Sequence, residues 1–201
     1  MQSGLYIIGT PIGNLSDLSP RAVEILQNVD LIAAEDTRVF GKLAHHFNIK
    51  TKTIACHEHN ERDIVGSLIE KISNGMAVAA VSDAGMPGIS DPGFRIVRAA
   101  REAGVPVFVV PGPTAAISAL VLSGFPTDRF TFCGFFDEKK VREDNKIRHT
   151  IIYYESPNRI MDTIKILASV MPERKIAIVR EITKIYEETI IGQRSSCTRC
   201  L

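Results

Sequence analysis

Residues 76–93 read MAVAAVSDAGMPGISDPG, an apolar run that changes abruptly into a loop rich in glycine and proline. The run 76–81 has the length and apolar character of a buried strand, and a helical pattern from Phe94 to Ala103 follows the loop. The loop itself, Ser82 to Gly93, is longer and richer in glycine than a strand-to-helix connection requires. This stretch predicts one unit of an α/β fold whose loop lines a ligand site.

The same alternation extends to both sides of this unit. Short apolar runs typical of strands occur at 5–8, 31–34, 51–56 and 105–110, and between them apolar residues recur with helical spacing. Ser19 followed by Pro20 is typical of a helix start, with the serine as N-cap. Repeated strand-helix-strand units predict a mainly parallel sheet covered by helices.

Beyond Gly124 the pattern becomes less regular. Strands are predicted near 129–135, 150–155, 175–180 and 186–191, with a helix over 158–170 and a charged segment at 137–148. We therefore expect an N-terminal α/β domain over residues 1–114 and a smaller C-terminal α/β domain over residues 115–201, with a mixed sheet.

Composition restricts the class of protein. The 201 residues are 45% hydrophobic, which is enough for a buried core, and 24 basic against 23 acidic side chains leave a net charge of +1. No global field therefore draws the protein to nucleic acid or a membrane, and contacts with RNA must come from local patches. The four cysteines form no ladder of the secreted kind, and no leader or membrane span is recognisable, so we expect a cytoplasmic location.

Three loops that follow predicted strands are candidates for ligand binding, because open α/β sheets bind ligands beyond the carboxyl ends of their strands. They are Gly9 to Asn14, Ser82 to Gly93, and Pro111 to Ala116. An ordinary surface turn explains the first equally well, and a capped helix is compatible with the third. Within the second, Asp91-Pro92 is interpreted as an N-cap followed by proline at the first helical position.

The usual nucleotide motifs GxGxxG and GxxxxGK[ST] do not occur. Instead, seven segments in order resemble those of the ribosomal RNA small subunit methyltransferase I family, cytidine 2′-O-methyltransferases within the tetrapyrrole methylase superfamily. The segments are Gly9–Leu15, Ala34–Arg38, His57–Glu61, Ser82–Gly93, Pro111–Ala115, Tyr154–Arg159 and Arg180–Lys184.

The resemblance implies two α/β domains that bind S-adenosyl-L-methionine between them, a homodimer, and small-subunit ribosomal RNA or the assembled subunit as substrate. It assigns cofactor contacts to nine residues: Pro11, Gly85, Met86, Pro87, Ile89, Ser90, Thr114, Ala115 and Tyr154. Met86-Pro87 stands where many relatives carry Asp-Pro.

The substrate side of the site is expected to contain Arg38, His57, Asn60, Glu61 and Arg159. A ribose hydroxyl needs a group that removes its proton, and Glu35 and Asp36 are the candidate general bases. Asp36 or Thr37 could equally be a helix N-cap. The five cations Lys139, Lys140, Arg142, Lys146 and Arg148 could contact RNA phosphates. No metal site is expected, because His57 and His59 lack a second ligand pair.

The chain departs from the family at its end. Residues 193–201 read QRSSCTRCL where relatives continue with a helix and further strands, so we expect a truncated second domain, and Cys197 and Cys200 lack partners for a zinc site. Two other functions remain open: a methylase of the same fold that acts on a small molecule such as a tetrapyrrole, and an inactive module for dimerisation or binding.

Overall fold

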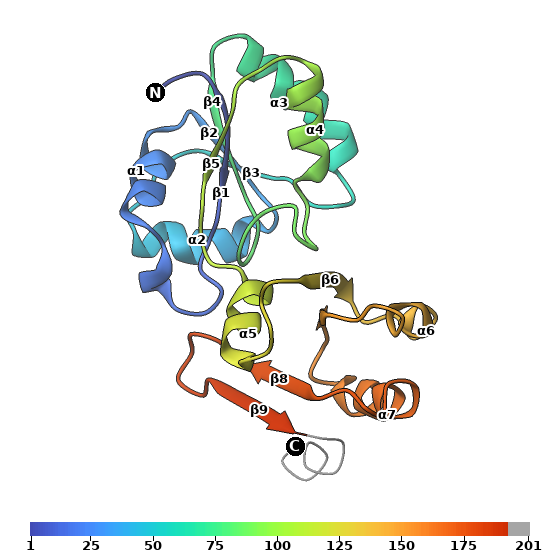
Figure 1. Ribbon diagram of the computed structural model, residues 1–201. Helices are drawn as coiled ribbons and strands as arrows, with labels where there is room; N and C mark the ends of the chain where they lie inside the picture. Colours follow the sequence, from blue (N-terminus) through green and yellow to red (C-terminus); the bar gives the residue numbers. More distant parts are fainter. Residues whose placement is uncertain (193–201) are drawn as a thin grey trace. The chain divides into compact units, whose positions relative to one another are not determined.

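A computed structural model describes residues 1–192 of the chain, which divides into a first compact unit, residues 1–114, and a second that begins at Ala115 (Figure 1). The cysteine pair Cys197 and Cys200 lies outside the described residues. None of the helices within residues 1–192 has the length and apolarity needed to cross a bilayer.

The first unit follows the predicted alternation closely. Its strands are β1 (Gly4–Ile8), β2 (Leu31–Ala34), β3 (Thr53–Ala55), β4 (Ala77–Val81) and β5 (Val107–Val110). Its helices are α1 (Pro20–Asn28), α2 (Thr37–His46), α3 (Glu61–Ser73) and α4 (Phe94–Glu102), with a short 3-10 turn, η1 (Leu15–Asp17). The strands form one parallel sheet of order β3-β2-β4-β1-β5, which confirms the predicted fold class.

Helices cover both faces of this sheet, as Figure 1 shows for α1 and α2 on one side and α3 and α4 on the other. The alternation of side chains along β1 explains the layers: Tyr6 and Ile8 pack with α1 and α2, whereas Leu5 and Ile7 pack with α3 and α4. Because both faces are buried, every residue of β1, β2 and β4 is buried, as expected of central parallel strands.

Two predicted helix starts have different outcomes. Ser19 caps α1 as expected, since its hydroxyl accepts a hydrogen bond from the Ala22 amide at 3.1 Å and Pro20 is the first helical residue. The interpretation of Asp91 as an N-cap is wrong. Helix α4 begins only at Phe94, and its N-cap is Gly93, which adopts φ 133° and is therefore a position suited to glycine. The Asp91 carboxyl therefore does not cap α4.

The second unit contains α5 (Ala115–Ser123), β6 (Phe130–Phe135), α6 (Val141–Asp144), β7 (Thr150–Tyr154), α7 (Ile160–Val170), β8 (Ile176–Arg180) and β9 (Glu188–Gly192). Parallel and antiparallel pairing both occur in it, but in two separate two-stranded sheets. Strands β6 and β7 pair in parallel, and β8 and β9 pair antiparallel. The Leu120 side chain of α5 packs with Ile152 of β7 in a small core.

The ends of β1 and β5 are held together by a backbone contact between Gly9 and Gly112. A Cβ built on Gly112 would lie 2.7 Å from the Cα of Gly9, and one built on Gly9 would lie 2.6 Å from the Cα of Gly112. Since real Cβ atoms essentially never approach backbone this closely, neither position tolerates a side chain without movement of the two loops. The glycines therefore set the spacing of the loops that follow β1 and β5.

A Gly112→Ala substitution should lower the free energy of unfolding by about 1–3 kcal/mol, because the added methyl group overpacks the contact with Gly9. Gly66→Ala is the matched control, since nothing lies within 4 Å of a Cβ at this helical position and the change should stabilise α3 by about 0.5–1 kcal/mol. Urea denaturation followed by circular dichroism measures both. Equal stability of Gly112→Ala and the unchanged protein would contradict the account.

Candidate active site

The loops predicted to bind ligand come together at one edge of the five-stranded sheet. In a parallel sheet all carboxyl ends lie at the same edge, so the segments after β3, β2, β4, β1 and β5 are neighbours in that order. They contribute, respectively, His57–Glu61, Glu35–Arg38, Ser82–Gly93, Gly9–Asn14 and Pro111–Thr114. Segments far apart in sequence thus form one rim, called here the carboxyl rim.

The loop Ser82–Gly93 is anchored to the loop after β1 by a short antiparallel bridge. The amide of Thr10 donates to the Gly85 carbonyl at 2.9 Å, and the amide of Gly85 donates to the Thr10 carbonyl at 3.1 Å. The Thr10 side chain is 2% exposed, and its hydroxyl donates to the Ser82 carbonyl at 3.1 Å. Gly85 adopts φ 85°, which lets the chain turn sharply at the bridge.

Most of the residues predicted to contact the cofactor lie on this rim. Pro11 directly follows the bridged Thr10, while Gly85, Met86, Pro87, Ile89 and Ser90 belong to the anchored loop and Thr114 ends the first unit. Ile89 is 42% exposed, and Ser90 is held at φ 61°. The rim therefore presents to a ligand the exposed Ile89 side chain and a backbone that turns at Gly85 and Ser90.

Two of the predicted cofactor residues, Ala115 and Tyr154, belong to the second unit. They lie close to one another, because the amide of Ala116 donates to the Tyr154 hydroxyl at 3.3 Å. The Tyr154 ring also packs edge-to-face against Phe132, with centroids 4.8 Å apart. Tyr154 thus fixes the first turn of α5 from within its own unit.

Glu35 and Asp83 brace the ends of the neighbouring strands β2 and β4. The Asp83 amide donates to Oε2 of Glu35 at 3.1 Å, and the Asp36 amide donates to Oδ1 of Asp83 at 3.0 Å. Burial raises the pKa of Glu35, and the nearby carboxylates of Asp83 and Asp36 raise it further against the effect of the amide hydrogen bond. Glu35 therefore holds a proton more readily than an ordinary glutamate.

Asp36 has the opposite environment. Its carboxylate accepts hydrogen bonds from the Arg38 guanidinium, at 2.7 Å from Nη2, and from the Arg38 amide at 2.8 Å, which makes it the N-cap of α2. These hydrogen bonds hold the pKa of Asp36 far below its usual range. Asp36 was predicted to be either a general base or a helix N-cap, and in the structure it is the N-cap of α2. A carboxylate whose charged form is stabilised in this way is a weak proton acceptor.

Asp91, which sequence reasoning assigned to helix capping, lies instead among the acidic groups of the rim. Burial, followed by the charge of Glu35, raises the pKa of Asp91 to about 6, although a hydrogen bond from the Ser82 hydroxyl lowers it. Asp83 also contributes to the rise. Asp83 and Asp91 belong to the loop that was predicted to line a ligand site, but neither was named among the individual site residues.

His57, Asn60 and Glu61 shape the turn between β3 and α3. The Asn60 side chain accepts from the His57 amide at 2.8 Å and donates to the Ala55 carbonyl at 3.1 Å. Glu61 is 3% exposed, accepts from the Gly93 amide at 3.2 Å and pairs with Arg95 at 3.5 Å. The Glu61 carboxylate thus supports the start of α4 rather than facing solvent. Within residues 1–192, no group of three His, Cys, Asp or Glu side chains is placed to hold a metal ion.

Arg159 lies in the second unit, immediately before α7. Its guanidinium pairs with Glu155 at 2.9 Å, and the same carboxylate accepts from Thr163 at 2.5 Å and from the Ser156 amide at 2.6 Å. Burial alone would raise the pKa of Glu155, but the hydrogen bonds from Thr163, Ser156 and Arg159 outweigh it and lower the pKa. The Arg159 side chain remains 60% exposed, so its outer face is accessible.

Residues 4–196 match the family described as Tetrapyrrole (Corrin/Porphyrin) Methylases. The chain is 49% identical to ribosomal RNA small subunit methyltransferase I of Vibrio cholerae, over 94% of this chain and 67% of that protein. It is 46% identical to the protein of the same name from Escherichia coli O157:H7, over 95% of this chain and 69% of that protein.

Solved structures share the fold at lower identity. The methyltransferase CobJ superposes with a TM-score of 0.71 at 19% identity, over 96% of this chain and 87% of that chain. Uroporphyrin-III C-methyltransferase from Thermus thermophilus, solved with S-adenosylhomocysteine, superposes with a TM-score of 0.66 at 20% identity, over 98% of this chain and 92% of that chain.

The environment of Asp91 predicts a pH-dependent stability. Because its pKa is about 6 in the folded protein and about 4 in an unfolded chain, the folded state binds this proton more tightly. Stability therefore falls as pH rises from about 4 to about 6. Asp91→Asn removes the charge and should raise the free energy of unfolding by about 1 kcal/mol at pH 7.5, with little change at pH 4.

Thermal unfolding of the two proteins at both pH values measures this difference. Asp17→Asn makes the same chemical change at an exposed position of η1 and serves as the control. If Asp91→Asn changed the free energy of unfolding by the same amount at pH 4 and at pH 7.5, burial and the neighbouring charges would not destabilise the ionised Asp91 carboxylate, and the explanation would be wrong.

Proposed function

This chain belongs to the tetrapyrrole methylase family, and on that premise we propose that it is an S-adenosylmethionine-dependent methyltransferase that modifies the 2′-hydroxyl of a cytidine in small-subunit ribosomal RNA. The observation that carries the proposal is the 49% identity over 94% of the chain to a protein named ribosomal RNA small subunit methyltransferase I. Both the bare ribosomal RNA and the assembled small subunit are candidate substrates.

A small-molecule methylase is the competing function, since the uroporphyrin-III C-methyltransferase shares the fold. At 20% identity that similarity concerns the fold alone. Relatives with ribosomal RNA in their names are 44–49% identical over 91–95% of this chain. The proposal therefore favours RNA.

The residues present on the carboxyl rim fit the proposed cofactor. S-adenosylmethionine supplies an electrophilic methyl group on a positively charged sulfur and carries a cationic amino group. The rim presents the carboxyls of Asp83 and Asp91, whose negative charge complements such a cation. The turned backbone of Gly85 and the exposed Ile89 suit an apolar ring. Pro11 and Thr114 are proposed to complete the binding residues of the rim, and Ala115 and Tyr154 remain proposed cofactor contacts of the second unit.

Glu35 is the proposed general base. A base that works near neutral pH needs a pKa close to the working pH, and burial moves the pKa of Glu35 in that direction whereas Arg38 moves that of Asp36 away from it. Asp91, whose carboxyl interacts with Glu35, is proposed to share the proton that Glu35 accepts. Asp36 is reassigned to positioning Arg38, whose side chain is 89% exposed and available to RNA.

The proposed RNA contacts of the second unit lie around α6. Lys139, Lys140, Arg142, Lys146 and Arg148 are all exposed there, and single-stranded or distorted RNA could approach them through its phosphates. His57, Asn60 and the outer face of Arg159 remain proposed substrate contacts. A cytoplasmic homodimer also remains part of the proposal, and light scattering of the purified protein measures its mass directly.

Methyl transfer from labelled S-adenosylmethionine tests the function. Small subunits and 16S RNA from a strain that lacks this methyltransferase should accept label, and nuclease digestion should release it as 2′-O-methylcytidine. Porphyrin precursors should remain unlabelled. Label in the porphyrin arm alone would transfer the assignment to a small-molecule methylase, and no label in any arm would favour the inactive binding module.

Glu35→Gln should reduce the rate of methyl transfer by about 10²–10⁴-fold, because the amide cannot accept the ribose proton. Calorimetry should show that S-adenosylhomocysteine still binds. Asp36→Asn, a substitution of the same kind next to it, should cost less than about tenfold, since it weakens a helix cap rather than proton transfer. If both variants lost a similar fraction of the methyl-transfer rate, Glu35 would not be the general base in preference to Asp36.

The double variant Lys139→Ala/Lys146→Ala should weaken RNA binding most at low salt. Each lost phosphate contact should reduce the slope of log affinity against log salt concentration by about 0.7–0.9. Lys71→Ala, which removes an exposed lysine from the last turn of α3, is the control. Filter binding between 50 and 200 mM salt provides the slopes, and a slope unchanged in the double variant would place the RNA elsewhere.

A further inference from the structure

Glu61 is a buried carboxylate that the proposed methyl transfer does not use. It accepts a hydrogen bond from the Gly93 amide at 3.2 Å, and it pairs with the Arg95 guanidinium at 3.5 Å. A buried charge is costly unless it is both paired and hydrogen-bonded, and Glu61 meets both conditions. The first residue of α3 therefore holds the start of α4 on either side of one residue, Phe94.

Phe94 and Arg95 are both accessible at this junction. Phe94 is 67% exposed, and the Arg95 side chain is 43% exposed although its Nε atom faces Glu61. The backbone before them is also fixed, because Gly93 is the N-cap of α4 and the Gly88 amide donates to the Pro92 carbonyl at 2.9 Å. An aromatic ring and a guanidinium are thus presented to solvent from a backbone that hydrogen bonds hold in place.

Arg98 and Arg101 extend this surface along the helix. An α-helix has 3.6 residues per turn, so positions 94, 95, 98 and 101 lie within about a third of its circumference. All four are exposed, whereas Ile96 and Ala100 are buried in the core on the other side. Since α4 contains three arginines and one glutamate, its outer surface is cationic. It is called here the α4 face and consists of Phe94, Arg95, Arg98 and Arg101.

The α4 face begins at the carboxyl rim. Phe94 directly follows the loop Ser82–Gly93, and a Cβ built on Gly88 would lie 3.6 Å from the Phe94 amide nitrogen. Gly88 is the chain neighbour of Ile89, a proposed cofactor contact. The α4 face therefore continues the surface on which the methyl donor is proposed to bind.

The rim and the α4 face carry opposite charge. Asp83 and Asp91 of the rim repel an RNA backbone and complement the cationic methyl donor, whereas the arginines of α4 attract phosphate. Proteins bind single-stranded RNA with aromatic rings that stack on bases and with cations that contact phosphates. The α4 face has both kinds of group beside the proposed site of methyl transfer, so its chemistry favours an RNA strand as its occupant.

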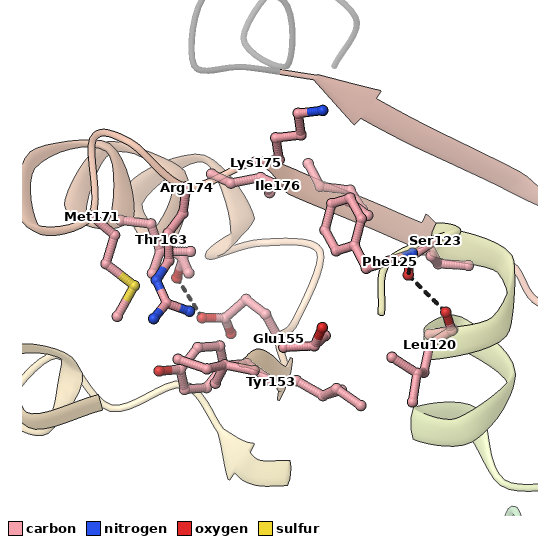
Figure 2. Close-up of a pocket in the computed structure, with 18 of the residues that line it drawn as sticks. Leu120, Ser123, Phe125, Tyr153, Glu155, Thr163, Met171, Arg174, Lys175 and Ile176 are labelled. Carbon is pink, nitrogen blue, oxygen red and sulfur yellow. Dashed lines mark hydrogen bonds between the residues drawn. The ribbon is translucent and has the colours of Figure 1, made fainter. Parts of the chain in front are cut away.

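The second unit contains a pair of the same kind. Glu155, which lines the pocket in Figure 2, is buried and pairs with the largely exposed Arg159. The dashed line from Thr163 in Figure 2 marks a further hydrogen bond to this carboxylate. In each unit a buried glutamate holds an accessible arginine, and Arg159 is already a proposed substrate contact. The repeated arrangement supports the same use for Arg95.

We propose that Phe94 and Arg95 bind single-stranded RNA beside the ribose that is methylated, Phe94 by stacking on a base and Arg95 by donating to a phosphate. Glu61 is the positioning residue, because it orients the Arg95 guanidinium and does not itself touch the RNA. Its contact uses the Nε atom, and a guanidinium has further N–H donors for a phosphate. The inference rests on the proposed RNA methyltransferase function and adds that a base next to the acceptor nucleotide is unpaired.

Kinetics with the RNA substrate that accepts label test the stacking. Phe94→Leu removes the ring but keeps an apolar side chain, so the KM for RNA should rise at least about fivefold, whereas Phe94→Tyr should leave it unchanged. Affinity for S-adenosylhomocysteine, measured by calorimetry, should be the same in all variants. Phe130→Leu, the same change at an exposed residue of β6, is the control. Equal KM values for Phe94→Leu and the unchanged protein would overturn the proposal.

The salt dependence of RNA binding tests the phosphate contact. Arg95→Ala should reduce the slope of log affinity against log salt concentration by about 0.7, the value for one phosphate of a single strand, and Phe94→Leu should not change the slope. Lys71→Ala removes an exposed cation of α3 and is the control. An unchanged slope for Arg95→Ala would contradict the phosphate contact.

A double-mutant cycle tests the positioning role of Glu61. Glu61→Gln has nearly the same size but no charge, so it should weaken RNA binding in the protein that has Arg95 and cause no further loss in Arg95→Ala. Circular dichroism confirms that each variant is folded. If the two losses simply added, Glu61 would not act through Arg95.

Failure of this inference differs from failure of the proposed function. If the unchanged protein transfers no label to RNA, the proposed function is wrong and the inference is wrong with it. If it methylates RNA while Phe94→Leu and Arg95→Ala keep the original KM and salt slope, only the inference is wrong. A change in mass by light scattering for Phe94→Leu, with RNA affinity unchanged, would assign the α4 face to a second copy of this chain instead.

Discussion

The backbone contact between Gly9 and Gly112 determines where the loops of the carboxyl rim can lie. Because each glycine occupies the space that a Cβ on the other would need, the segments after β1 and β5 approach more closely than any other residue pair would allow. The Thr10–Gly85 bridge then attaches the loop after β4 to the same point. Three loops separated by many residues in sequence are thereby fixed to one another through backbone contacts and the buried Thr10 hydroxyl, which leaves their other side chains available for a ligand.

The acidic groups of the rim repel one another, which destabilises the folded protein, and the same groups can attract a cationic ligand. Glu35 and Asp83 are tied into the ends of β2 and β4 by amide hydrogen bonds, and Asp91 is held near them with a raised pKa. Such a concentration of like charge is unfavourable in the free protein and becomes favourable when a cationic ligand binds. The same interactions distinguish Glu35, whose pKa is raised by burial and by the neighbouring carboxylates, from Asp36, whose charge Arg38 already stabilises.

Much of this structure follows from the sequence because the first unit repeats one pattern. The buried strand 77–81 was predicted at 76–81, and apolar spacing indicated that a helix such as 61–73 lies between strands. Ser19 was recognised at a helix start because its partner, the Ala22 amide, is local. Asp91 was misassigned for the opposite reason: its Ser82 and Glu35 neighbours lie at other strand ends, and the helix starts at Phe94. The contacts of Glu61 with Gly93 and Arg95, and the separation of β7 from β8, likewise depend on tertiary packing that spacing cannot reveal.

We infer that the backbone contact at the carboxyl rim holds a cofactor site, and calorimetry with S-adenosylhomocysteine tests this most directly. The account predicts one binding site per chain in the unchanged protein. It also predicts that Gly9→Val, which forces the loops after β1 and β5 apart, abolishes binding in a sample that circular dichroism shows to be folded. Absence of binding by the unchanged, folded protein, or undiminished binding by Gly9→Val, would contradict it.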